Sequence, residues 1–77
     1  MELNKLNQLI DEALKEGDKR PGAMPQTNIL NAEFALGKFY ALIFIIEDLY
    51  GLDEMIATKE RTQSKVDELF IRTQELY

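Results

Sequence analysis

The sequence contains no cysteine, no histidine and no tryptophan, and it has only four glycines and two prolines among 77 residues. Without cysteine the chain forms no disulfide, and without cysteine or histidine it lacks the usual ligands of a structural zinc ion. A core in so short a chain seldom supplies more than about 3 to 5 kcal/mol of stability, so small domains depend on such staples. Because both are missing, we expect association with another chain to stabilise this fold.

The same absences argue against catalysis. General acid–base chemistry at neutral pH most often uses histidine, and the single serine, Ser64, has no base available to it. Adjacent acidic residues such as Asp11 and Glu12 diverge by about 100° on a helix and do not converge on one substrate. No phosphate-binding glycine loop or metal-binding spacing occurs. We therefore expect a protein that is not an enzyme and that uses no cofactor and no metal.

Positive charge is also scarce, with 9 Lys and Arg against 14 Asp and Glu and a net charge of −5. Lysine and arginine supply most of the non-specific affinity for phosphates, so this chain is not expected to be a general nucleic-acid binder. The segment MELNKLNQLIDEAL has no basic region ahead of an apolar run, and we expect no signal peptide and a cytoplasmic location.

The longest apolar segment is LNAEFALGKFYALIFIIEDLY, residues 30–50. On a helical wheel it carries two apolar faces on nearly opposite sides. The first face consists of Ala32, Ala35, Phe39, Leu42, Ile46 and Leu49. The second, which we call the open strip, consists of Leu30, Phe34, Gly37, Ala41 and Phe44. Charges at Glu33, Lys38, Glu47 and Asp48 interrupt the segment. A membrane span needs about 17 to 25 apolar residues, so we expect a core helix without membrane contact.

Amphipathic patterns on either side of this segment predict an all-α, three-helix domain spanning residues 1–77. The helices are expected at about 2–16, 28–50 and 53–76, with a loop at 17–27. A link of two or three residues makes the second and third helices an antiparallel hairpin, and the first helix packs across it. Gly17 is predicted to cap the first helix, Thr27 or Asn28 the second, and Asp53 the third.

The central helix has more apolar surface than the two outer helices are expected to cover. The outer helices each offer one apolar stripe, which together cover about half to two thirds of the central helix, and a helix that is apolar nearly all round needs cover on several sides. The open strip is the face expected to stay uncovered and to form an oligomer interface. Gly37 within it has two explanations: another backbone approaches closely there, or the glycine is simply tolerated.

Two functions fit this pattern. The first is a non-enzymatic interaction protein that self-associates and is able to bind or inhibit a larger protein partner. The alternative is an oligomer that holds a small anionic ligand, such as a metabolite or a nucleotide, in pockets between subunits. The ligand would lie at the N-terminus of the second helix, where free N–H groups favour anions, near Lys19, Arg20, Thr27 and Asn28.

The central helix also carries a resemblance. A short first helix, a loop and a central helix containing Gly37, Phe39, Ala41 and Leu42 are similar to the plan of small helical phage proteins that sequester cyclic oligonucleotide messengers of bacterial defence. This resemblance implies a phage protein that binds cyclic nucleotides and thereby inhibits host signalling. It covers about a dozen residues and transfers no individual binding residue to this chain.

Overall fold

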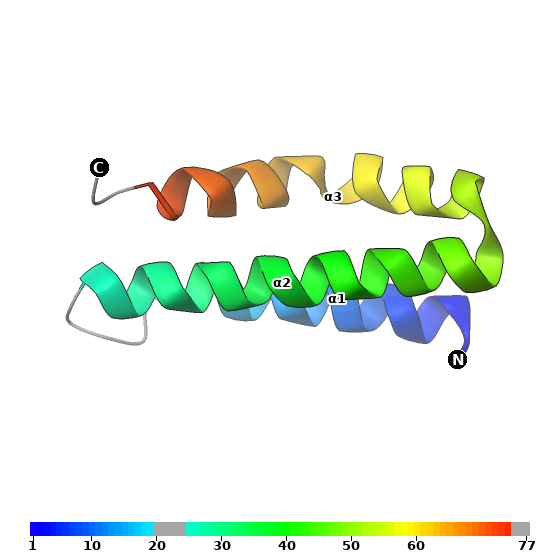
Figure 1. Ribbon diagram of the computed structural model, residues 1–77, viewed down its shortest axis with the longest axis horizontal. Helices are drawn as coiled ribbons and strands as arrows, with labels where there is room; N and C mark the ends of the chain where they lie inside the picture. Colours follow the sequence, from blue (N-terminus) through cyan, green and yellow to red (C-terminus); the bar gives the residue numbers. More distant parts are fainter. Residues whose placement is uncertain (20–24, 75–77) are drawn as a thin grey trace.

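The computed structural model describes residues 1–19 and 25–74, which form three helices and no strand within those ranges. These are α1 (Leu3–Asp18), α2 (Pro25–Tyr50) and α3 (Leu52–Arg72). The predicted all-α fold is confirmed: α2 and α3 form a hairpin and α1 packs along α2 (Figure 1). The result is a rod of 39 × 20 × 15 Å in which α2 contacts both other helices.

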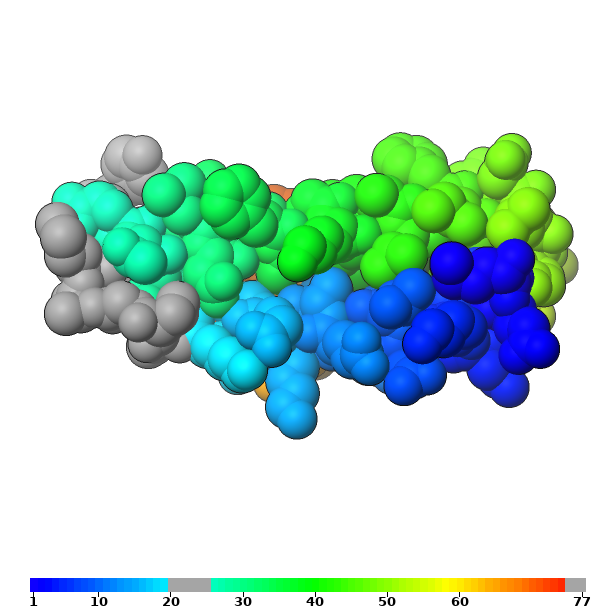
Figure 2. Space-filling model, turned by 90° about the horizontal axis from the view of Figure 1, so that it is seen from below, coloured from blue at the N-terminus to red at the C-terminus, as the bar shows by residue number. Residues whose placement is uncertain are grey.

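The core lies where both outer helices meet α2. Its largest fully buried side chains are Phe39, Leu6, Ile10, Ile46 and Leu69. The space-filling view shows α1 and α2 lying against each other along the length of α1 (Figure 2). The buried face of α2 is wider than the first face predicted from the sequence, because Ile29, Leu36 and Ile43 are also buried. Leu49, which was predicted to be part of that face, is 55% exposed.

The end of α1 differs from the prediction. Gly17 does not cap this helix, which continues to Asp18, and among the described glycines only Gly51 has a positive φ. Gly17 is instead a point of close approach, since a Cβ there would lie 2.3 Å from Ala35 Cβ. Side chains of the other two helices donate hydrogen bonds to backbone carbonyls at the end of α1. Asn31 Nδ2 donates to Glu16 O at 2.6 Å, and Arg72 of α3 donates to Asp18 O at 2.6 Å.

The starts of α2 and α3 also differ from the predicted caps. Thr27 and Asn28 lie inside the first turn of α2, which begins at Pro25, three residues before the predicted start. Proline suits this position because the first helical N–H has no partner within the helix. The cap of α3 is Gly51 and not Asp53. Gly51 is the single residue between α2 and α3, and its φ of 98° is one that glycine adopts without strain.

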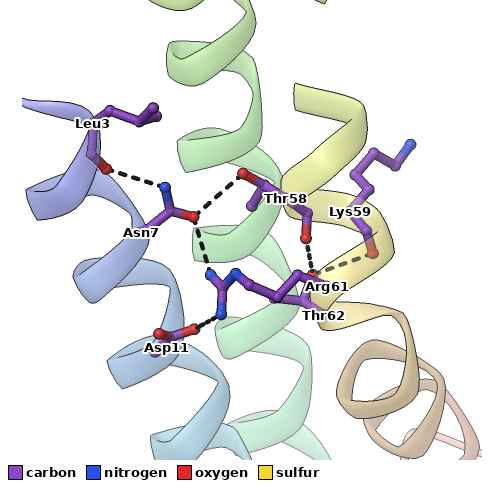
Figure 3. Close-up of polar contacts among 7 residues, drawn as sticks. All are labelled: Leu3, Asn7, Asp11, Thr58, Lys59, Arg61 and Thr62. Carbon is purple, nitrogen blue, oxygen red and sulfur yellow. Dashed lines mark hydrogen bonds and ion pairs between the residues drawn. The ribbon is translucent and has the colours of Figure 1, made fainter. Parts of the chain in front are cut away.

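Polar contacts join α1 to α3, and Asn7 is at their centre (Figure 3). Its Oδ1 accepts hydrogen bonds from Thr58 Oγ1 at 3.2 Å and from Arg61 at 3.0 Å. The same guanidinium lies 2.7 Å from Asp11 Oδ1. The sequence pattern did not indicate that Thr58 is buried, and its contact with Asn7 explains how a hydroxyl is accommodated there.

At the other end of this seam, Arg72 joins α3 to the last turn of α1. One of its guanidinium nitrogens lies 2.6 Å from the backbone oxygen of Asp18, and another lies 3.1 Å from the Asp18 carboxylate. The Arg72 side chain is only 14% exposed. Charged hydrogen bonds are stronger when shielded from water, so Arg72 holds this end of the α1–α3 seam more firmly than the exposed Arg61–Asp11 pair holds the other.

Candidate functional site

The open strip lies on the side of α2 that neither α1 nor α3 covers. All five of its residues are exposed in the isolated chain. Phe34 and Phe44 are each 67% exposed, and Leu30 is 49% exposed. A buried phenylalanine normally removes about 150 to 250 Å² from water, so these two rings are unusual surface residues. The strip is therefore a continuous apolar surface running along the outer face of the central helix.

Apolar surface continues beyond the C-terminal half of the strip, on the side of α2 that faces α1. Ile45, which the two-face pattern did not assign to either face, is 41% exposed beside Phe44. A groove of about 430 Å³ separates α2 from α1 next to Ala41. The groove is lined by Leu9, Glu12, Ala13, Glu16, Lys38, Ala41 and Leu42. Its floor is apolar and its rim is charged, an arrangement typical of protein contact surfaces. The apolar run 41–46 contained the signal for this extension, but a single wheel could not show how much of it α1 leaves exposed.

Gly37 lies in the middle of the open strip and has no packing role among residues 1–19 and 25–74. A Cβ built there would meet nothing within 4 Å. Glycine in a helix costs roughly 0.8 to 1 kcal/mol relative to alanine, so the fold of one chain gains nothing from it. Gly17, in contrast, is required by its neighbours. Of the two explanations for Gly37, a close approach from outside the chain is compatible with this open surface.

On the charged rim of the groove, the Glu16 carboxylate is paired with a lysine. Lys19 Nζ lies 2.8 Å from Glu16 Oε1. This hydrogen bond and the lysine charge lower the pKa of the Glu16 carboxyl, with smaller contributions in the same direction from Lys38 and Lys15. The Glu16 carboxylate gives the α1 side of the groove a negative edge, which Lys38 on the α2 side faces.

The residues predicted to bind an anion lie near the end of α1 and in the first turn of α2. Lys19 is already paired with Glu16, and Arg20 lies outside the described residues. Thr27 is exposed on the first turn of α2, whereas Asn28 is 8% exposed and makes its own interaction within the fold. The first turn of α2 carries the positive end of the helix dipole, and anion binding there stays a prediction.

No protein family, curated protein or solved structure matches this chain. The surface of the molecule itself must therefore indicate its function. Within residues 1–19 and 25–74, no three acidic side chains lie close enough together to hold a metal ion.

The helix α2 is long and apolar enough, by length and composition, to cross a membrane. A core helix of a water-soluble protein passes the same test, but such a helix is mostly buried. Here only 39% of the most apolar 18-residue window is buried within the chain. The exposed remainder includes the open strip, so α2 has more apolar surface than its own chain covers.

Proposed function

We propose that this protein is a non-enzymatic interaction module that assembles with copies of itself through the open strip of α2. The observation that carries the proposal is the exposure of Phe34 and Phe44, both 67%, on the same face of one helix with small residues between them. Isolated exposed apolar residues are common on monomers, but contiguous apolar patches of several hundred Å² mark interaction sites.

The size of the surface supports this proposal. At 67% exposure, Phe34 and Phe44 each offer about 100 to 170 Å², given ring areas of roughly 150 to 250 Å². With Leu30, Ile45 and the small residues between, the patch offers on the order of 500 Å² per copy. Two copies would bury about 1,000 Å² in total, the lower bound for a specific interface. The edge of the α1–α2 groove adds to that area.

A second copy is a better occupant than a lipid bilayer. The outer surface of α2 carries Glu33, Lys38 and Asp48 along the margins of the apolar patch, and each is exposed. Charges within a hydrocarbon layer are costly, whereas the polar rim of a protein interface accommodates them. To cross a membrane, α2 would also have to leave α1 and α3, which bury its other faces.

The proposal is tested by a pair of matched substitutions. Ala41→Glu places a charge in the centre of the open strip, and Ala57→Glu places the same charge on an exposed position of α3. Light scattering coupled to size exclusion should give a mass above that of one chain for the parent and for Ala57→Glu. Ala41→Glu should shift the mass toward one chain of 8.9 kDa.

Three outcomes would contradict this function. The parent could be monomeric throughout, or Ala41→Glu could keep the parent's mass while remaining folded by circular dichroism. The third is a chain that is monomeric in buffer and floats with lipid vesicles, which would assign the strip to a membrane surface.

A further inference from the structure

The charges of α2 are distributed unfavourably for a helix that acts alone. Its first turn has no acidic residue, and its last turn has no basic residue. Glu47 and Asp48 instead lie near its C-terminal end, where the helix dipole is already negative. Asp53 and Glu54 follow in the first turn of α3. Four acidic residues therefore flank the turn where α2 meets α3, the acidic corner, at the right-hand end of the rod in Figure 1.

This acidic corner restricts how two copies can pair through α2. A parallel two-fold arrangement would bring both acidic corners together at one end, and like charges placed side by side oppose association. In an antiparallel arrangement each corner lies beside the N-terminal half of the partner's α2, whose dipole is positive. The two corners are then separated by most of the 39 Å length of the rod.

The residues of the open strip are arranged evenly about position 39. Gly37 and Ala41 lie two residues before and after this position, and Phe34 and Phe44 lie five residues before and after it. An antiparallel two-fold axis at position 39 consequently sets small residues opposite small residues where the helices cross, and rings opposite rings on either side. Backbones approach closely where side chains are small, and no described part of the chain lies within 4 Å of a Cβ built at Gly37.

We propose that two copies of the chain pair antiparallel through their open strips, crossing at Gly37 and Ala41, with Phe34 of each copy packed on the partner's Phe44. This inference rests on the self-association proposed above and adds the direction and register of the pair. The polar Asp48 then lies opposite the partner's Leu30, at the margin of the contact and close to the start of that α2.

The direction is tested by attaching nitroxide spin labels to single cysteines, which is straightforward because the chain has no native cysteine. Asp48→Cys places one label nine residues from the proposed axis. In the antiparallel pair the two labelled sites are eighteen residues apart along the helix, about 27 Å at 1.5 Å per residue. Lys38→Cys is the matched control, because it lies one residue from the axis and its two labels should be less than about 20 Å apart for helices separated by 8 to 10 Å.

Pulsed electron paramagnetic resonance should therefore give a long distance for labelled Asp48→Cys and a short one for labelled Lys38→Cys. Short distances at both sites would indicate a parallel pair and overturn the proposed direction. Long distances at both would show that a different surface forms the dimer. Absence of dipolar coupling in both variants, together with a monomeric mass of the parent, would show that self-association itself fails. The unlabelled cysteine variants should have the same mass as the parent. This control shows whether a substitution prevents pairing or whether the pair forms in another direction.

Discussion

Replacing Gly17 with alanine tests the packing at the end of α1 most sharply. In an ordinary helix interior this change stabilises the fold by roughly 0.8 to 1 kcal/mol, because alanine has the higher helix propensity. Here the added Cβ would lie 2.3 Å from Ala35 Cβ and 3.1 Å from Leu69 Cδ1. A Cβ is fixed by the backbone, so helices α1 and α2 must separate. Such overpacking typically costs about 1 to 3 kcal/mol.

The net effect of Gly17→Ala is therefore a loss of up to about 2 kcal/mol in the free energy of unfolding, in place of the gain expected at an ordinary helix position. For a chain of 77 residues, each kcal/mol corresponds to a shift of about 4 to 8 °C in Tm. Thermal and urea unfolding followed by circular dichroism measures both quantities. All variants should be compared at one low protein concentration, because association with a second copy raises apparent stability.

Two further variants separate overpacking from other causes. Gly37→Ala makes the same chemical change where a Cβ meets nothing, so it should raise the stability of the monomer by roughly 0.5 to 1 kcal/mol. Ala35→Gly in the Gly17→Ala background removes the opposing Cβ and should recover part of the loss, a coupling that a double-mutant cycle isolates. Equal stabilisation by Gly17→Ala and Gly37→Ala would refute the close approach of α1 to α2.

The remaining predictions concern polar contacts. Arg72→Ala should lower the free energy of unfolding by about 1 to 2 kcal/mol, because its largely buried guanidinium bonds both the carboxylate and the backbone oxygen of Asp18. Arg61→Ala should cost less than about 1 kcal/mol, since its ion pair is exposed to water, and equal losses in urea titrations would contradict this ranking. The pKa of Glu16 is lowered by Lys19, so the stabilisation from this pair is complete above the ordinary value of 4.5 and is lost as the pH falls through the lower folded-state pKa. In Lys19→Ala, an NMR titration should show the pKa of Glu16 rising back toward 4.5, and an unchanged pKa would rule out the lysine as its cause.

Periodicity and composition were sufficient to predict the helices and their order. The apolar residues of α1, with Leu6 and Ile10 at their centre, are buried as their spacing indicated. The apolar excess of α2 was also visible, because no arrangement of two one-sided helices covers a segment that is apolar nearly all round. The exposure of Phe34 and Phe44 agrees with the expectation that part of α2 stays uncovered. Their role as an interface remains a prediction.

Local signals failed where tertiary contacts determined the structure. Gly17 has the sequence signature of a helix cap, but its lack of a side chain serves a contact with Ala35, which is eighteen residues away. Asp53 is a good capping residue, yet the one-residue turn at Gly51 starts α3 before it. Ile43 was assigned to neither face because a wheel does not show how far two neighbouring helices extend around α2. These features depend on partners that are distant in sequence, and local propensity carries no information about them.

The most direct test of the central claim is the mass of the unmodified chain in solution, measured by sedimentation equilibrium over a range of concentrations. If α2 has more apolar surface than its own chain covers, the weight-average mass should rise above 8.9 kDa as the concentration increases, with a dimer as the first assembled species. A constant 8.9 kDa up to about 100 μM, where even an association worth only about 5.5 kcal/mol would be half complete, would contradict the account.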